Sequence, residues 1–256
     1  MVRAEKSLSG LFALILWVTF GCTDDKDLDF TTYEGNAKLK RSLMYSSVND
    51  AEPIAIVDEY EYDGHDRISK VSSPLYNNGD IIGTIKYDLY EYNSHGQLTT
   101  VSNFNANSGS STGYINLTNY SYKYSADGLK EKQLIEYPQI NSFEYITYFY
   151  KDNKLAKSEK YNNKDELQDY TVYEYKGDRL VKDIWYSSKN EVNRITNHIY
   201  TKGLNTETTI YGGRNSEKIR EIRKTYDANY NLIMLESTEL ATWSSATSYV
   251  MRYEYF

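Results

Sequence analysis

The side chains best suited to metal chemistry are three histidines, two of which recur at one position of a repeated motif. His65 and His95 each follow the second tyrosine of a Tyr-Glu-Tyr motif by three residues. His198 stands in a degenerate copy of the same motif, so a three-ligand metal site would need the first, second and sixth repeats to meet. We interpret His65 and His95 as turn residues and expect no metal site.

Carboxylates are abundant, since the chain has 36 acidic residues. Neighbouring pairs that could act as acid and base are Asp63 with Asp66, Asp165 with Glu166, and Asp178 with Asp183. Glycoside hydrolysis uses two carboxyl groups about 5 to 10 Å apart across a cleft, and no spacing here distinguishes such a pair. Serine-hydrolase elbows, phosphate loops and zinc-protease helices are also absent. We expect no catalytic residues and no cofactor.

The lone cysteine, Cys22, lies at the end of an N-terminal export signal. Arg3 and Lys6 precede a ten-residue apolar run from Leu11 to Phe20, and Gly21 comes directly before the cysteine. Ten apolar residues are too few to span a bilayer, which takes about 20. The arrangement resembles a bacterial lipoprotein signal, which implies cleavage after residue 21 and lipidation of Cys22. The alternative is a free thiol beside an ordinary signal peptide.

Acidic residues follow the cysteine at once, in the order Asp24, Asp25, Lys26 and Asp27. This tract is similar to the export tag that carries some Gram-negative lipoproteins to the outer face of the outer membrane, although a polar tether has the same composition. We therefore expect an outer-membrane lipoprotein that faces the cell exterior, with residues 22–38 as a flexible acidic tether.

The overall charge argues against two classes of partner. The formal net charge is −7, and no basic stripe is present. Nucleic acids and anionic membrane surfaces need clustered Lys and Arg, so we expect no nucleic acid and no membrane contact beyond the lipid anchor. One cysteine also excludes an intrachain disulfide and a zinc site built on paired thiolates.

The elements that would position any site form a tyrosine-rich repeat. Tyr occurs 28 times, often as Tyr-x-Tyr, which we call a head. Period-two spacing places both tyrosines of a head on one face of a strand. The second aromatics are separated by steps of 30, 32, 26, 25, 25, 26 and 29 residues, and they are Tyr62, Tyr92, Tyr124, Tyr150, Tyr175, Tyr200, Tyr226 and Tyr255.

A short string of Gly, Asn and Asp follows most heads and then an aliphatic residue, as a tight hairpin requires. These units resemble YD (Rhs-type) repeats, and the chain is also similar to small repeat lipoproteins of unknown function with a porin-like β fold. The resemblance is carried by Tyr62-Asp63 with Arg67-Ile68, Tyr92-Asn93 with Gly96-Gln97-Leu98, and Tyr226-Asp227 with Asn231-Leu232.

Two strands per unit predict an all-β domain at residues 39–256, with about 15 strands in one antiparallel meander. Such a sheet must curl, so we expect a half-barrel, a flattened barrel or a spiral with the tyrosines mainly on its concave face. An opening hairpin is expected at residues 39–45 and 54–62, and a mobile loop at 105–112. Residues 251–256 should form the first strand of a truncated final repeat, which pairs as the edge of the sheet.

Two functions remain open. The first is a lipid-anchored, non-enzymatic binding or interaction module, with a glycan or protein ligand on the tyrosine-lined face or near Trp185 and Trp243. Tyrosines that simply fill a thin sheet are the alternative explanation for that face. The second function is an enzyme acting on envelope or dietary polysaccharide. Charged strands such as 154–161 argue against a membrane-embedded barrel, so the chain without residues 1–22 should dissolve without detergent.

Overall fold

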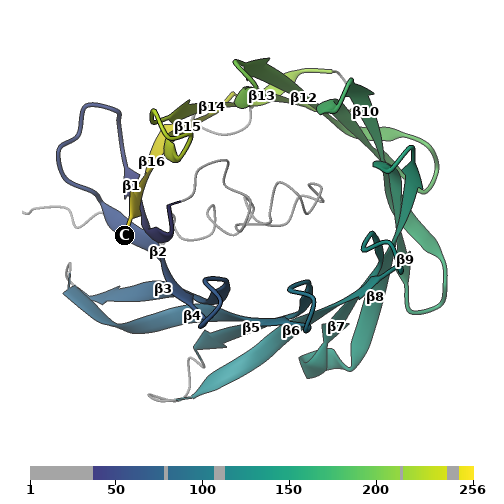
Figure 1. Ribbon diagram of the computed structural model, residues 1–256, viewed down its shortest axis with the longest axis horizontal. Coiled ribbons are helices and arrows are strands. Elements are labelled where there is room, and N and C mark those ends of the chain that lie inside the picture. Colours follow the sequence, from purple (N-terminus) through teal and green to yellow (C-terminus); the bar gives the residue numbers. More distant parts are fainter. Residues whose placement is uncertain (1–36, 78–79, 107–112, 214–215, 241–247) are drawn as a thin grey trace, which may run out of the picture.

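The chain folds into a closed β-barrel of 16 antiparallel strands, in which each strand pairs with its neighbours in sequence (Figure 1). The computed structural model describes residues 37–77, 80–106, 113–213, 216–240 and 248–256. The sites expected at Cys22, Asp24, Asp25, Lys26 and Asp27, and at Trp243, lie outside these residues. The expected all-β antiparallel meander is confirmed, and it closes fully.

The strands are β1 (Leu39–Tyr45), β2 (Ala55–Tyr62), β3 (Ile68–Asn77), β4 (Asp80–Tyr92), β5 (Leu98–Ala106), β6 (Tyr114–Tyr124), β7 (Lys130–Tyr137), β8 (Ser142–Lys151), β9 (Lys154–Asn162), β10 (Leu167–Lys176), β11 (Arg179–Ser187), β12 (Val192–Thr201), β13 (Leu204–Gly212), β14 (Lys218–Tyr226), β15 (Leu232–Glu239) and β16 (Ser248–Tyr255). A short 3-10 helix, η3 (Pro138–Ile140), joins β7 to β8. No helix in the described part of the chain is long and apolar enough to cross a bilayer.

Several head turns are held by the residue directly after the second tyrosine, which is Asp63, Asn93, Ser125 or Asp227. The Asp63 carboxylate accepts hydrogen bonds from the backbone N–H groups of His65 (2.8 Å) and Arg67 (3.0 Å). The Asn93 side chain accepts the corresponding bonds at 2.9 and 3.0 Å. This contact explains why Asp or Asn follows the tyrosine, because a short side-chain oxygen can stabilise the turn locally.

The second tyrosine of each head is also the site of a β-bulge. The strand register shifts directly before Tyr62, Tyr92, Tyr124, Tyr150, Tyr175, Tyr200 and Tyr226. Several of these hydroxyls donate to a backbone carbonyl on the preceding strand, as Tyr62 does to Leu39 (2.8 Å) and Tyr92 to Ile68 (2.8 Å). Bulges increase local twist, so their repetition favours a sheet that curls.

The barrel closes through β1 and β16, and this corrects the expected sheet edge at the C-terminal segment. Ser42 pairs with Tyr253 and Tyr45 with Val250, and the Phe256 N–H donates to the Lys38 carbonyl at 3.0 Å. Closure satisfies the backbone groups that an edge strand would leave unpaired. A smaller correction concerns the expected loop at 105–112, because Asn105 lies within β5; residues 107–112 are outside the described ranges.

The face that bears the head tyrosines is the inner face of the barrel. Tyr60, Val71, Val101 and Tyr173 alternate onto this face and are only 6 to 8% exposed. Side chains on a concave surface converge and lose contact with solvent, whereas those on the convex surface diverge. The tyrosines therefore lie on the concave face, as expected. Leu39, Tyr60, Ile68 and Val71 form one apolar cluster there, with Tyr90 and Tyr253 packed against it.

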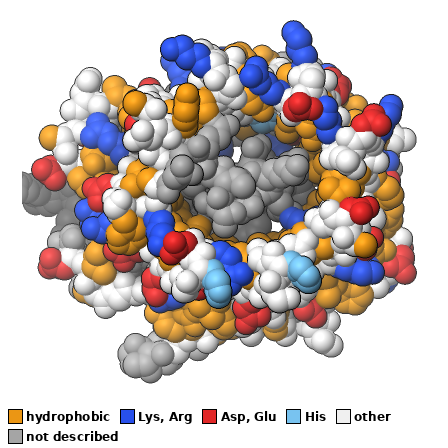
Figure 2. Space-filling view, viewed as in Figure 1, with side chains coloured by type: hydrophobic (Ala, Val, Ile, Leu, Met, Phe, Trp, Pro, Cys, Tyr) orange, Lys and Arg blue, Asp and Glu red, His pale blue; other side chains and the backbone are white. Residues whose placement is uncertain are grey.

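The outer face combines stacked aromatic pairs with charges. Tyr145 stacks on Tyr161 with ring centroids 5.1 Å apart, and Tyr170 stacks on Tyr186 at 4.8 Å. Lys132 lies over the Tyr145 ring at 3.7 Å. Figure 2 shows the head-turn end of the barrel, where charged side chains of both signs stand among the apolar ones.

Candidate functional sites

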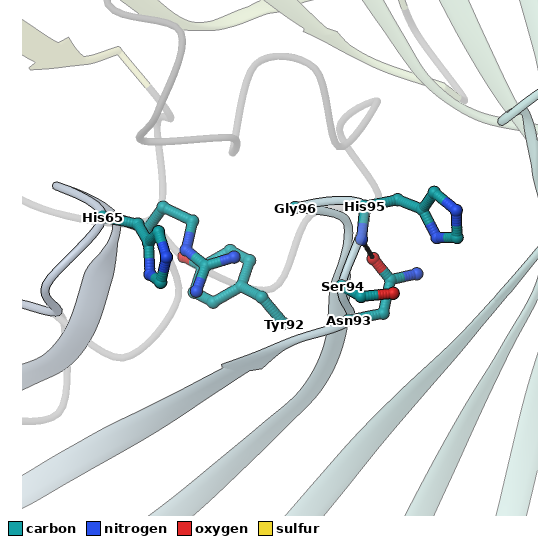
Figure 3. A pocket seen from close by; sticks show the side chains of 7 residues that line it. His65, Tyr92, Asn93, Ser94, His95 and Gly96 are labelled. Carbon is teal, nitrogen blue, oxygen red and sulfur yellow. Dashed lines mark hydrogen bonds between the residues drawn. The ribbon is translucent and has the colours of Figure 1, made fainter.

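The first candidate site is a groove of about 490 Å³ between the first two head turns, which we call the rim groove. It is lined by His65, Arg67, Tyr92, Asn93, Ser94, His95 and Gly96 (Figure 3). The Arg67 guanidinium carbon lies 4.4 Å from the centre of the Tyr92 ring. The turn geometry places these side chains, since Gly96 adopts a positive φ of 80° that favours glycine.

The two histidines of the rim groove do not converge. Each belongs to its own turn, and the His95 ring points away from His65 (Figure 3). Within the described ranges, no group of three or more His, Cys, Asp or Glu side chains is placed to hold a metal ion. His198 lies on β12 in the inner face, within a separate cluster of side chains.

Arg67 in the rim groove already has an anionic partner. Its guanidinium Nη2 lies 2.6 Å from the Asp63 carboxylate. The hydrogen bond from the Arg67 side chain is the main cause that lowers the pKa of Asp63 to about 2; burial opposes this shift, and the backbone donors of Arg67 and His65 add to it. The groove therefore offers an aromatic ring and polar turn groups, but little free positive charge.

The second candidate is a buried polar cluster around His198. His198 Nε2 lies 3.0 Å from Asp183 Oδ2, and its Nδ1 lies 3.1 Å from Asn205 Nδ2 and 3.3 Å from Thr208 Oγ1. All four side chains are 3 to 9% exposed. We call these residues the His198 cluster. It arises because His198 replaces the first tyrosine of a head, while strand register brings Asp183 and Thr208 beside it.

The hydrogen-bond partners of His198 define the tautomer of its imidazole ring. The Asn205 amide nitrogen only donates, so His198 Nδ1 accepts, and Nε2 carries the hydrogen that goes to Asp183. An Asp-His-Thr arrangement of this kind could in principle activate the Thr208 hydroxyl. Thr208 is only 7% exposed, which leaves little room for a substrate. The His198 cluster is therefore best explained as a buried hydrogen-bond network that stabilises the fold.

The third candidate is a set of inner-face carboxyl groups nearer the long-loop end. Burial raises the pKa of Asp58 and of Asp88, and the charge of Asp58 adds to the rise at Asp88. Ser73 donates to Asp58 at 2.7 Å, and the positive charge of Lys86 acts on both carboxyl groups. These two carboxyl groups come from β2 and β4 and face the barrel interior.

The carboxylates that are neighbours in the sequence do not face one another as acid/base pairs in the structure. Asp66 pairs with Lys38, whereas Asp63 pairs with Arg67. Asp178 is exposed beside Lys154 (2.8 Å), whereas Asp183 is buried in the His198 cluster. Asp165, in the turn with Glu166, accepts a hydrogen bond from Tyr145.

Trp185 lies on the inner face, where the sequence suggested a glycan platform. Burial raises the pKa of the neighbouring Asp169 more than the nearby Trp185 lowers it. The ring is half-buried beside Arg194. Near the apolar cluster, Tyr60 is only 6% exposed, and burial raises the pKa of both Tyr90 and Tyr253 strongly. These head tyrosines pack on the inner face, and a ligand on that face stays a prediction.

Sequence reasoning missed several members of these sites. Asp58, Asp88 and Arg194 had no motif, and Asn205 and Thr208 are ordinary polar strand residues. The available signal was the replacement of tyrosine by His198 at a head, because a polar residue at a buried repeat position must find partners.

No family model matches the chain, and no curated protein matches it. Among solved structures, its fold is similar to a porin-like protein from Bacteroides uniformis, with 9% identity, a TM-score of 0.39, and coverage of 85% of this chain and 98% of that one. A porin-like protein from Bacteroides vulgatus gives 10% identity, a TM-score of 0.40, and coverage of 86% and 99%. The TcdB2-TccC3 structure gives 14% identity and a TM-score of 0.25, with coverage of 82% of this chain and 13% of that one.

Proposed function

We propose that this chain is a lipid-anchored barrel of the outer membrane, held outside the bilayer by Cys22 and facing the cell exterior, where it binds a ligand without catalysing a reaction. The anchor and the acidic tag at Asp24, Asp25, Lys26 and Asp27 come from the sequence. The observation that carries the proposal is the chemistry of the outer face.

Charged side chains interrupt the outer face in the middle of its strands. On β9, Lys157 pairs with Glu159 at 2.7 Å, and on β14 Arg223 pairs with Glu221. Lys182 on β11 pairs with Glu174 at 3.3 Å. A Lys or Arg on the lipid face costs about 2 to 4 kcal/mol at the bilayer midplane. A surface of this kind favours water over lipid around the barrel.

Solubility without detergent tests the placement outside the bilayer. The chain without residues 1–22 should purify in plain buffer as a monodisperse species with a strand-type circular dichroism spectrum. Recovery only in micelles, with loss of strand content when the detergent is removed, would support an embedded barrel instead.

The anchor and its direction need two further measurements. Labelled palmitate should enter the full chain and should not enter the Cys22→Ala variant. External protease should then degrade the protein on intact cells. If Ala replacements at Asp24, Asp25 and Asp27 leave the protein equally accessible to protease, the tract is only a tether.

A polysaccharide-cleaving enzyme is the second candidate, and the Asp58–Asp88 carboxyl groups favour it. A carboxyl group with a raised pKa can act as a general acid at neutral pH. Asp58→Asn and Asp88→Asn should each abolish any glycan hydrolysis by the purified barrel. Hydrolysis that persists in both variants would exclude this pair as the catalytic groups.

A further inference from the structure

Arg194 differs from two other positively charged groups on the inner face, each of which has an anionic partner. Lys160 pairs with Glu144 at 2.7 Å, and Arg220 pairs with Glu239. Within the described residues, no ion pair or hydrogen bond is formed by the Arg194 side chain, and its Nε is buried without a partner. The residue as a whole is only half-buried, so the other guanidinium donors are open to a ligand, while the buried Nε lacks the partner that a buried donor normally has.

Strand register defines the surroundings of Arg194. On one side, β11 places Trp185 in register with Arg194, and the guanidinium carbon lies 5.6 Å from the centre of the indole ring. On the other side, β13 places Gly212 in register, so no side chain from that position covers the guanidinium.

The chemistry of these groups specifies a ligand. A guanidinium presents parallel N–H donors that match the two oxygens of a carboxylate. An aromatic ring beside it offers an apolar surface for the flat face of a saturated ring. Asp169 and Ser187, which are paired across β10 and β11, supply polar partners for hydroxyl groups nearby. A sugar ring that carries a carboxylate has all three features.

We propose that Trp185 and Arg194 form a binding site inside the barrel for a uronic acid, with the carboxylate on Arg194 and the sugar ring against Trp185. This inference rests on the proposed role of the barrel as a binding module and names the chemical class of its ligand.

Tryptophan fluorescence tests the site directly. In the chain without residues 1–22, Trp243→Phe leaves Trp185 as the sole tryptophan. Glucuronate and digalacturonate should change its emission in a saturable way, whereas glucose should not. Arg194→Gln should raise the Kd by about tenfold or more, and Arg194→Lys should weaken binding as well because the parallel donors are lost.

Arg67→Gln is the matched control, because Arg67 already pairs with Asp63 and should leave the Kd unchanged. Each variant should keep the circular dichroism and unfolding temperature of its parent. Equal responses to acetate, phosphate and glucuronate would overturn the proposal, as would glucuronate binding that is unchanged in Arg194→Gln. If uronic acid binding is not found, but the barrel dissolves without detergent and the full chain is palmitoylated, only the ligand class is wrong and the proposed anchored binding module is still supported.

Discussion

The inner face is built in two chemical styles from one repeat. In the early hairpins, the first head tyrosine faces an aliphatic residue on the paired strand, as Tyr60 faces Val71 and Tyr90 faces Val101. In the later hairpins the head residue instead bonds a polar group on the preceding hairpin, as Tyr148 does to Gln133 and His198 to Asp183. The repeat therefore fixes the backbone geometry, whereas the side chains that pack on the inner face can be apolar or polar, provided that every buried polar group has a hydrogen-bond partner.

Removing His198 should have the largest effect. His198→Ala leaves the Asp183 carboxylate buried without its partner, and breaking a buried charged interaction from one side costs about 3 to 5 kcal/mol. Urea unfolding should show a loss of this size. His95→Ala, at an exposed turn, is the control and should change stability little. A loss in His198→Ala as small as in the control would mean that the polar style is not essential.

Truncation on the apolar side should cost less. Val71→Ala removes two buried methyl groups from the cluster of Leu39, Tyr60 and Ile68, which is worth about 2 kcal/mol. The same denaturation assay measures it, with Val48→Ala at an exposed position as the control. A cost above that of His198→Ala would reverse the expected ranking of the two styles.

Deleting one hydroxyl group from each side sharpens the comparison. Tyr148→Phe leaves Gln133 without its 2.6 Å donor and should cost about 1 kcal/mol. Tyr90→Phe should cost nothing measurable, because its hydroxyl forms no hydrogen bond that the described residues show, and burial opposes its charged form. Equal effects of the two changes on the unfolding midpoint would contradict the distinction.

The smallest effect is expected in the pH dependence. Burial raises the pKa of Asp58, so the folded state holds its proton at higher pH than the unfolded chain does. The unfolding free energy should therefore fall as pH rises from the ordinary carboxyl range through the raised pKa. Asp58→Asn keeps an acceptor for Ser73 and should make urea midpoints less dependent on pH above the ordinary carboxyl range. An unchanged slope would assign the dependence to other groups, with Asp88 the first to test.

The sequence predicted the local structure of the repeat better than its closure. The opening hairpin is observed at Leu39–Tyr45 and Ala55–Tyr62, because apolar alternation and turn residues act over short distances. The pairing of β16 with β1 depends on total strand number and curvature, which no local pattern encodes.

The His198 cluster shows why sites were harder to predict. Asp183 and His198 are 15 residues apart and meet through the register of two neighbouring strands, β11 and β12. In the sequence, the head with His198 in place of tyrosine looked like a weakened copy of the repeat. In the structure, Asp183, Asn205 and Thr208 supply the hydrogen-bond partners of that histidine. Repeat positions compared across strands, rather than along the chain, would have exposed this match.

The seam between β1 and β16 changes the kind of unfolding that a repeat protein can show. Open repeat arrays fray from their ends and lose stability one unit at a time, because each unit contacts only its neighbours. Here the Phe256 N–H donates to the Lys38 carbonyl, and β1 pairs with β16, so the array has no free end from which to fray. Damage at any hairpin opens the whole ring, and the barrel should therefore melt as a single cooperative unit despite its modular origin.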